Sequence, residues 1–106
     1  METPIEPEQL RLHEIPPDFI SCVSDDGTKV DMSLQGLTAV PDWVGNLAAL
    51  TMLDLSGNQL TVVPEWVGNL TALTTLDLSG NQLTAVPQSV GNLTALTRLG
   101  LGGNGP

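Results

Sequence analysis

Aromatic side chains are scarce in this chain, which has Trp43, Trp66 and Phe19 and no tyrosine. Apolar residues still make up 41% of its 106 residues, close to the share in globular proteins, so we expect a folded domain with an aliphatic core. Cysteine is equally rare. Cys22 stands alone, which excludes an intramolecular disulfide and a thiolate metal cluster. No run of about 18 apolar residues occurs, so no segment is predicted to span a bilayer.

Basic residues are also few. The chain has three, Arg11, Lys29 and Arg98, against twelve acidic residues, and its formal net charge is −9. This balance argues against binding to nucleic acid or to an anionic membrane, because both attract lysine and arginine. A basic protein partner fits the charge better. Residues 1–8 are acidic and interrupted by prolines, unlike a signal peptide, so we expect a flexible tail there and a cytoplasmic protein.

What the chain does have is a repeat of 23 residues. Segments 50–72 and 73–95 are identical at 19 of 23 positions, and the pattern extends back over 27–49 and forward into a partial unit, 96–106. The two central units carry the motif L-x-x-L-x-L-x-x-N-x-L, formed in one copy by Leu50, Leu53, Leu55, Asn58 and Leu60, and the first unit carries a variant with Val30 and Met32 in place of leucines. This motif resembles that of leucine-rich repeat proteins. The following L-T-x-V-P-x-x-V-G-N-L resembles the 23-residue class of bacterial, plant intracellular Ras-group-related and Roco proteins.

The resemblance implies an α/β repeat solenoid. Its right-handed coil would carry a parallel β-sheet on the concave face and short helical or 3₁₀ arcs on the convex face. The residues themselves also predict a strand in each unit. Leu53 and Leu55 alternate with Asp54, as in a strand with one buried face. Gly57 then permits a turn that a side chain would hinder.

The second half of each unit predicts the arc. Val67, Leu70 and Leu73 recur at a spacing of three, which is typical of a short helical or 3₁₀ segment facing inward. Gly68 and Asn69 suit the close of that segment, where a left-handed residue is common.

Both ends of the array depart from the pattern. Residues 9–26 align with part of a coil after one insertion at Pro17, and we interpret them as a degenerate repeat that caps the N-terminus. The sequence ends at Pro106, directly after the fourth predicted strand. We therefore expect fraying, end-to-end self-association, or a fragment of a longer array. The apolar edge predicted at this end comprises Val90, Leu93, Leu96, Leu99 and Leu101.

Stacked coils turn equivalent positions into columns on the concave face, which is the predicted partner-binding surface. Its candidate residues are Lys29, Asp31, Met52, Asp54, Thr75, Asp77 and Arg98. Asp31, Asp54 and Asp77 form the column that most favours a cationic partner. The alternative is that these carboxylates only bond to neighbouring serine hydroxyls. A metal site is not expected, because hard cations need about six or more converging oxygens and a flat row does not enclose them.

Two other sets are interpreted first as structural. An asparagine ladder should point inward and satisfy buried backbone groups of the turns; it comprises Asn58, Asn81 and Asn104. Trp43 and Trp66 lie one repeat apart on the predicted convex side. We expect their rings to form an offset stack that shields the arcs, and a convex partner contact is the alternative.

No set of residues supports catalysis. His13 and Cys22 have no sequence partners that would complete a nucleophile and base, and no phosphate loop, cofactor motif or metal motif occurs. We therefore predict a protein–protein interaction module and not an enzyme. The alternative is a structural spacer, or a fragment of a larger leucine-rich repeat signalling protein or effector, with no binding activity of its own.

Overall fold

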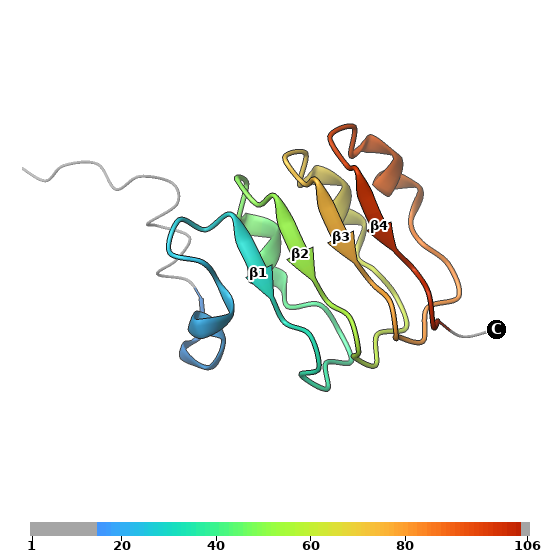
Figure 1. Ribbon diagram of the computed structural model, residues 1–106, viewed down its shortest axis with the longest axis horizontal. Helices are drawn as coiled ribbons and strands as arrows, with labels where there is room; N and C mark the ends of the chain where they lie inside the picture. Colours follow the sequence, from blue (N-terminus) through green and yellow to red (C-terminus); the bar gives the residue numbers. More distant parts are fainter. Residues whose placement is uncertain (1–14, 105–106) are drawn as a thin grey trace, which may run out of the picture.

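Within residues 15–104, which the computed structural model describes, four strands alternate with four short helices (Figure 1). The predicted tail over residues 1–8 lies outside this range. The strands are β1 (Lys29–Asp31), β2 (Met52–Asp54), β3 (Thr75–Asp77) and β4 (Arg98–Gly100). The helices are all 3₁₀ helices, namely η1 (Pro17–Cys22), η2 (Asp42–Asn46), η3 (Glu65–Asn69) and η4 (Gln88–Asn92).

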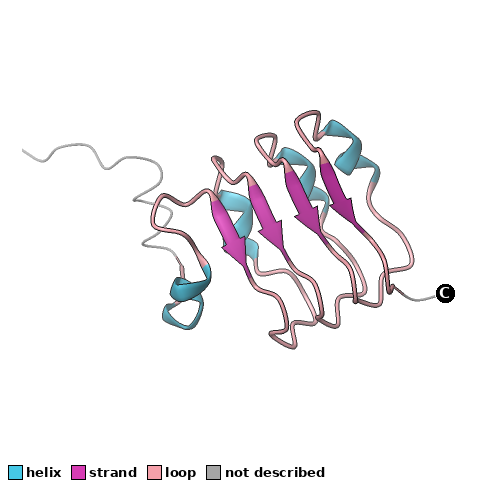
Figure 2. Cartoon of the chain, viewed as in Figure 1, coloured by secondary structure: helices cyan, strands magenta, loops and turns pink. Residues whose placement is uncertain are grey.

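The strands form one parallel sheet in the order β1-β2-β3-β4, and each strand pairs with the strand one repeat later. Helices η2, η3 and η4 lie behind the sheet as a second layer (Figure 2). Each strand has three residues, because one 23-residue coil must also hold two turns and an arc. This arrangement confirms the predicted repeat solenoid with a parallel sheet and short 3₁₀ arcs. No helix among residues 15–104 is long and apolar enough to cross a membrane.

The space between the two layers is filled by aliphatic side chains. At the inward strand positions of the first three coils the side chains are fully buried, and these residues are Val30, Met32, Leu53, Leu55, Leu76 and Leu78. Burial of each such side chain stabilises the fold by about 1.5–3 kcal/mol. In the fourth coil the equivalent residues Leu99 and Leu101 remain 42% and 39% exposed. They are exposed because, within the described residues, no fifth coil lies over them.

Each arc begins directly after a proline. Pro64 precedes η3, where its fixed φ and missing N–H suit a helix start. The Val67 N–H donates to the Pro64 carbonyl at 3.1 Å, and the Leu70 N–H donates to the Val67 carbonyl at 3.1 Å. The expected left-handed close at Gly68 and Asn69 is wrong, because neither residue is among the described residues with positive φ. Gly68 is instead buried within η3 and leaves room for the backbone of the next arc.

Buried asparagines connect successive coils. Asn81 is 5% exposed, and its Nδ2 donates to the carbonyl groups of Leu55 and Leu78, both at 3.0 Å. Its Oδ1 accepts from the Leu60 N–H at 3.0 Å. Equivalent bonds are made by Asn58 and Asn104. These side chains therefore satisfy backbone groups that the turns would otherwise leave buried and unpaired.

The outer edge of β1 is covered by the segment that precedes it. After η1, Val23 forms an isolated antiparallel bridge with Val30, and the Ser24 N–H donates to the Lys29 carbonyl at 2.9 Å. The Lys29 N–H in turn donates to Ser24 Oγ at 3.0 Å. Residues 9–14 lie outside the described range, so the interpretation of 9–26 as a capping repeat stays a prediction.

Candidate functional site on the concave sheet

Strand register places the predicted concave residues in two columns. One column consists of Lys29, Met52, Thr75 and Arg98, and the other of Asp31, Asp54, Asp77 and Gly100. Neighbouring strands of a sheet lie about 4.8 Å apart, so the three carboxylates are close neighbours on one surface. Asp31 is exposed, and the side chains of Asp54 and Asp77 are partly exposed.

Each aspartate also bonds to the start of the following turn. Asp54 Oδ1 accepts from the Ser56 N–H at 3.0 Å and from Ser56 Oγ at 2.7 Å. The same pair of bonds joins Asp31 to Ser33 and Asp77 to Ser79. Both bonds end on Oδ1, so within the described residues the second oxygen of each carboxylate is open to a further donor. The column therefore has a structural role at the turns and keeps acceptor capacity toward solvent.

The carboxylates do not converge on a point. No group of three or more His, Cys, Asp or Glu side chains among residues 15–104 is placed to hold a metal ion. Such a cation would need oxygens arranged around it, whereas a column on a sheet presents them in a row. The arrangement instead presents one carboxylate on each of the first three strands.

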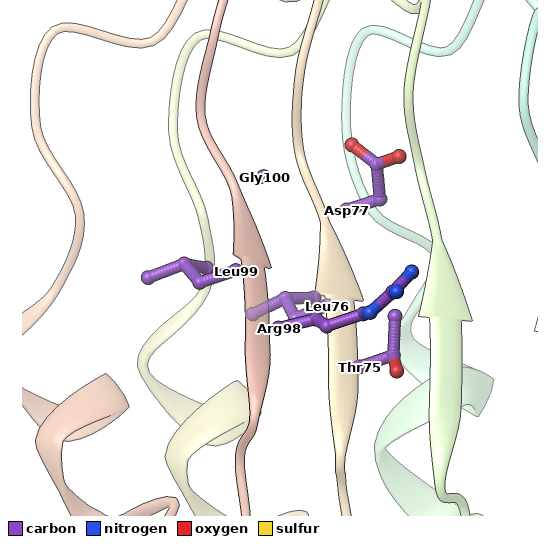
Figure 3. A pocket seen from close by; sticks show the side chains of 6 residues that line it. All are labelled: Thr75, Leu76, Asp77, Arg98, Leu99 and Gly100. Carbon is purple, nitrogen blue, oxygen red and sulfur yellow. The ribbon is translucent and has the colours of Figure 1, made fainter.

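The last two strands enclose a shallow hollow of about 370 Å³ on the sheet (Figure 3). It exists because Gly100 stands where the first three coils have aspartate, so no side chain fills that position. Arg98 extends over β3 with its guanidinium near Thr75, while Leu99 points away from β3 (Figure 3). The hollow thus has a cation on one side and the Asp77 carboxylate on the other.

Leu34 is a surface residue that the sequence reasoning missed. It occupies the turn position that Gly57, Gly80 and Gly103 fill in later coils, and all four have positive φ. Leu34 has φ 56° and is 81% exposed. A leucine in this left-handed conformation costs about 1–2 kcal/mol relative to the usual backbone. The sequence could have indicated this residue, because the first coil has leucine at the repeat position where the later three have glycine.

The two tryptophans pack separately on the convex side. They do not form the expected stack: within residues 15–104 the ring pair in contact is Phe19 and Trp43, with centroids 5.7 Å apart. The Trp66 ring lies instead against Gly45 of the preceding arc, where an added Cβ would come within 2.9 Å of ring carbon Cε3. Both side chains pack against the core, and Trp43 Nε1 is buried without a hydrogen-bond partner. Their geometry therefore supports packing more directly than partner contact.

Of the two N-terminal residues considered for reactivity, the structure describes Cys22. His13 lies outside the described residues. Cys22 is half-buried against the core, and burial, followed by the nearby charge of Asp31, raises the pKa of its thiol. A raised pKa lowers the thiolate fraction at neutral pH, which opposes reactivity.

A sheet of stacked, register-matched coils with an exposed concave side defines a solenoid repeat protein, a class in which such surfaces bind partners. The family model for a leucine-rich repeat region matches residues 31–105. The chain therefore belongs to the leucine-rich repeat family.

The solved structures similar to this chain include two from bacteria. An internalin from Listeria monocytogenes superposes with a TM-score of 0.65 and 31% identity, over 73% of this chain and 22% of that one. A leucine-rich repeat protein from Leptospira interrogans gives a TM-score of 0.51 and 32% identity, over 71% of this chain and 25% of the other. This chain thus spans about a quarter or less of each of these proteins. No curated protein matches the sequence.

Proposed function

We propose that the chain is a protein-binding module that takes a basic, extended segment of a partner on its concave sheet. The observation that carries the proposal is the aspartate column. Asp31, Asp54 and Asp77 lie on neighbouring strands, so their charges repel one another, and a cationic side chain between them would relieve that repulsion. Each carboxylate also offers an oxygen that the serine bonds leave open.

The other column indicates where the partner would sit. Lys29 and Arg98 are exposed at the two ends of that column and would repel a cationic partner. Met52 and Thr75 lie between them and carry no charge. The proposed binding centre is therefore Asp54 with its neighbour Asp77, beside Met52. Membership in a family of binding scaffolds supports a role in partner binding. The net charge of −9 supports a basic partner.

The experiment starts from a random peptide library displayed on phage and selected against the full chain. We expect enrichment of peptides rich in lysine and arginine. Selected peptides are then titrated by calorimetry against Asp54→Asn/Asp77→Asn, which removes two charges and keeps an oxygen acceptor for each serine. Affinity should fall about tenfold or more, since charge-assisted hydrogen bonds are lost.

A matched control separates local binding from net charge. Asp42→Asn/Glu65→Gln removes the same two charges at the starts of η2 and η3, behind the sheet. Affinity should change about twofold or less, because exposed charges at that range are screened. Equal losses in both double variants would refute the concave-face proposal.

The competing function is a spacer with no binding activity of its own. It is favoured by the near-identity of segments 50–72 and 73–95, which present almost the same surface twice. A spacer predicts no enriched peptide class in the selection. It also predicts that both double variants behave like the parent chain.

A further inference from the structure

Within residues 15–104, β4 has a neighbouring strand on one side only. In a parallel sheet, successive residues of a strand form their backbone hydrogen bonds alternately with the strand on one side and the strand on the other. The Leu55 and Leu78 amides donate to the carbonyl groups of Asp77 and Gly100 in the following strand, both at 2.8 Å. The equivalent amide of Leu101, and the N–H and C=O of Leu99, face the side of β4 where residues 15–104 supply no fifth strand. Such an edge is a template for pairing with another strand.

The same edge is apolar. Leu99 and Leu101 are 42% and 39% exposed, although their counterparts in the two preceding coils are fully buried. Leu99 points away from β3 toward the open side (Figure 3). Leu96 and Val90 lie behind it and are only partly buried. A partner on this edge would therefore gain both backbone hydrogen bonds and apolar contact.

We propose that this edge pairs with the same edge of a second copy of the chain, so that two β4 strands meet antiparallel about a two-fold axis at Leu99. In that register Leu99 faces Leu99 of the second copy, and the pair exchanges N–H to O=C hydrogen bonds. The two four-stranded sheets become one continuous sheet. The two Leu99 side chains then cover each other on the core side, and Leu101 lies opposite Thr97 of the second copy.

Charge favours this occupant. Residues 78–104 contain no acidic residue, and Arg98 is their one charged side chain. The two C-terminal ends can therefore approach without the repulsion that the acidic remainder of each chain would cause. In the two-fold register Arg98 lies opposite Gly100 of the second copy. Gly100 pairs with Asp77, so Arg98, on turning from its own β3 toward the second copy, would approach Asp77 of that copy across a position without a side chain.

The association should stop at two copies. Head-to-tail stacking would need a free edge on β1, but Ser24 and Val23 already bond there. An isologous contact uses the same patch on both copies and closes on itself. We therefore expect a dimer and no filament.

The test is sedimentation equilibrium and light scattering on the full chain up to about 1 mM, the range of weak association. The parent chain should shift with concentration from 11.1 kDa toward twice that mass. Leu99→Lys places like charges directly opposite each other and should abolish the shift. Thr94→Lys adds the same charge at an exposed position outside the strand and should keep the shift.

Two further measurements keep the proposal testable if Leu99→Lys misfolds. Arg98→Glu changes an exposed residue and should also weaken the dimer, because the introduced carboxylate would face Asp77 of the second copy. Amide exchange at Leu99 and Leu101 should slow as protein concentration rises. A parent chain that stays monomeric to about 1 mM, or that forms an open series of larger species, would overturn the proposal. Equal association of both lysine variants would do the same.

Discussion

One glycine position recurs in three arcs, at Gly45, Gly68 and Gly91, and has different surroundings in each. An alanine methyl at Gly68 would meet the Ser89 backbone of η4, with the Ser89 carbonyl carbon at 2.8 Å. At Gly45 it would meet the Trp66 ring, at 2.9 Å from Cε3. At Gly91 nothing lies within 4 Å. None of the three has positive φ, so their backbones accept alanine.

The three alanine variants therefore differ almost only in steric room. Replacing a compatible glycine by alanine stabilises a protein by about 0.4–1 kcal/mol through the unfolded chain, and this term is common to all three. Gly91→Ala should show that gain alone. Gly68→Ala should lose about 1–3 kcal/mol to overpacking, because the backbone of η4 must move. Gly45→Ala should fall between them, since a ring can shift by a few tenths of an ångström.

Thermal unfolding followed by circular dichroism measures the order. In a domain of this size about 1 kcal/mol shifts the midpoint by 4–8 °C, so Gly68→Ala should melt at least about 4 °C below Gly91→Ala. The reasoning is refuted if the three variants melt together, or if Gly91→Ala is the least stable of them.

Three further predictions concern buried and titrating groups. Asn81→Leu leaves the buried Leu60 N–H without its acceptor and removes one of the two asparagine donors on each of the Leu55 and Leu78 carbonyls. It should cost about 1–3 kcal/mol in urea unfolding, whereas Asn92→Leu at the exposed end of η4 should cost less than about 0.5 kcal/mol. Hydrogen bonds from Thr28 and then Ser24 lower the Asp26 pKa from 3.8 to about 2. The unfolded chain therefore binds more protons between these values, so this stability is present above about pH 4 and lost toward pH 2, and Asp26→Asn should flatten that dependence. Burial raises the pKa of Cys22, so iodoacetamide at pH 8 should alkylate it more slowly in the folded than in the unfolded chain.

Each of these has a contradicting result. Equal losses in the two asparagine variants would show that the ladder is not energetically important. If the stability of Asp26→Asn falls toward pH 2 as much as that of the parent chain, another group is responsible for the loss. Equal alkylation rates in folded and unfolded chain would contradict the half-buried thiol.

Much of the architecture follows from the repeat alone. A 23-residue period with leucines at strand spacing determines which side chains are buried, because only one phase of the coil places all of them inward. The concave columns follow from the same period, since equal spacing gives equal register. The turn at Gly57 was also predictable, because glycine permits backbone conformations that other residues avoid. The structure has Gly57 at a φ of 70°.

What the sequence could not predict depends on contacts between coils. Gly68 looked like a helix-ending glycine, but whether it adopts positive φ depends on how close the next arc lies. The Trp43–Trp66 stack failed for a related reason, because each ring packs toward the preceding segment and so reaches Phe19 or Gly45 first. The hollow beside Arg98 required knowing that Gly100 faces outward between two strands.

The residue at the start of each arc also affects the curvature of the solenoid. Trp66 inserts an indole ring between η2 and η3, whereas Ser89 at the same repeat position lets its Oγ donate to the Glu65 carbonyl at 2.8 Å. Helices η3 and η4 therefore pack more closely than η2 and η3, while the strands in front keep one spacing. The sheet should therefore bend more sharply between β1 and β2 than between β2 and β3. One convex side chain, Trp66, thus affects how strongly the concave surface is curved.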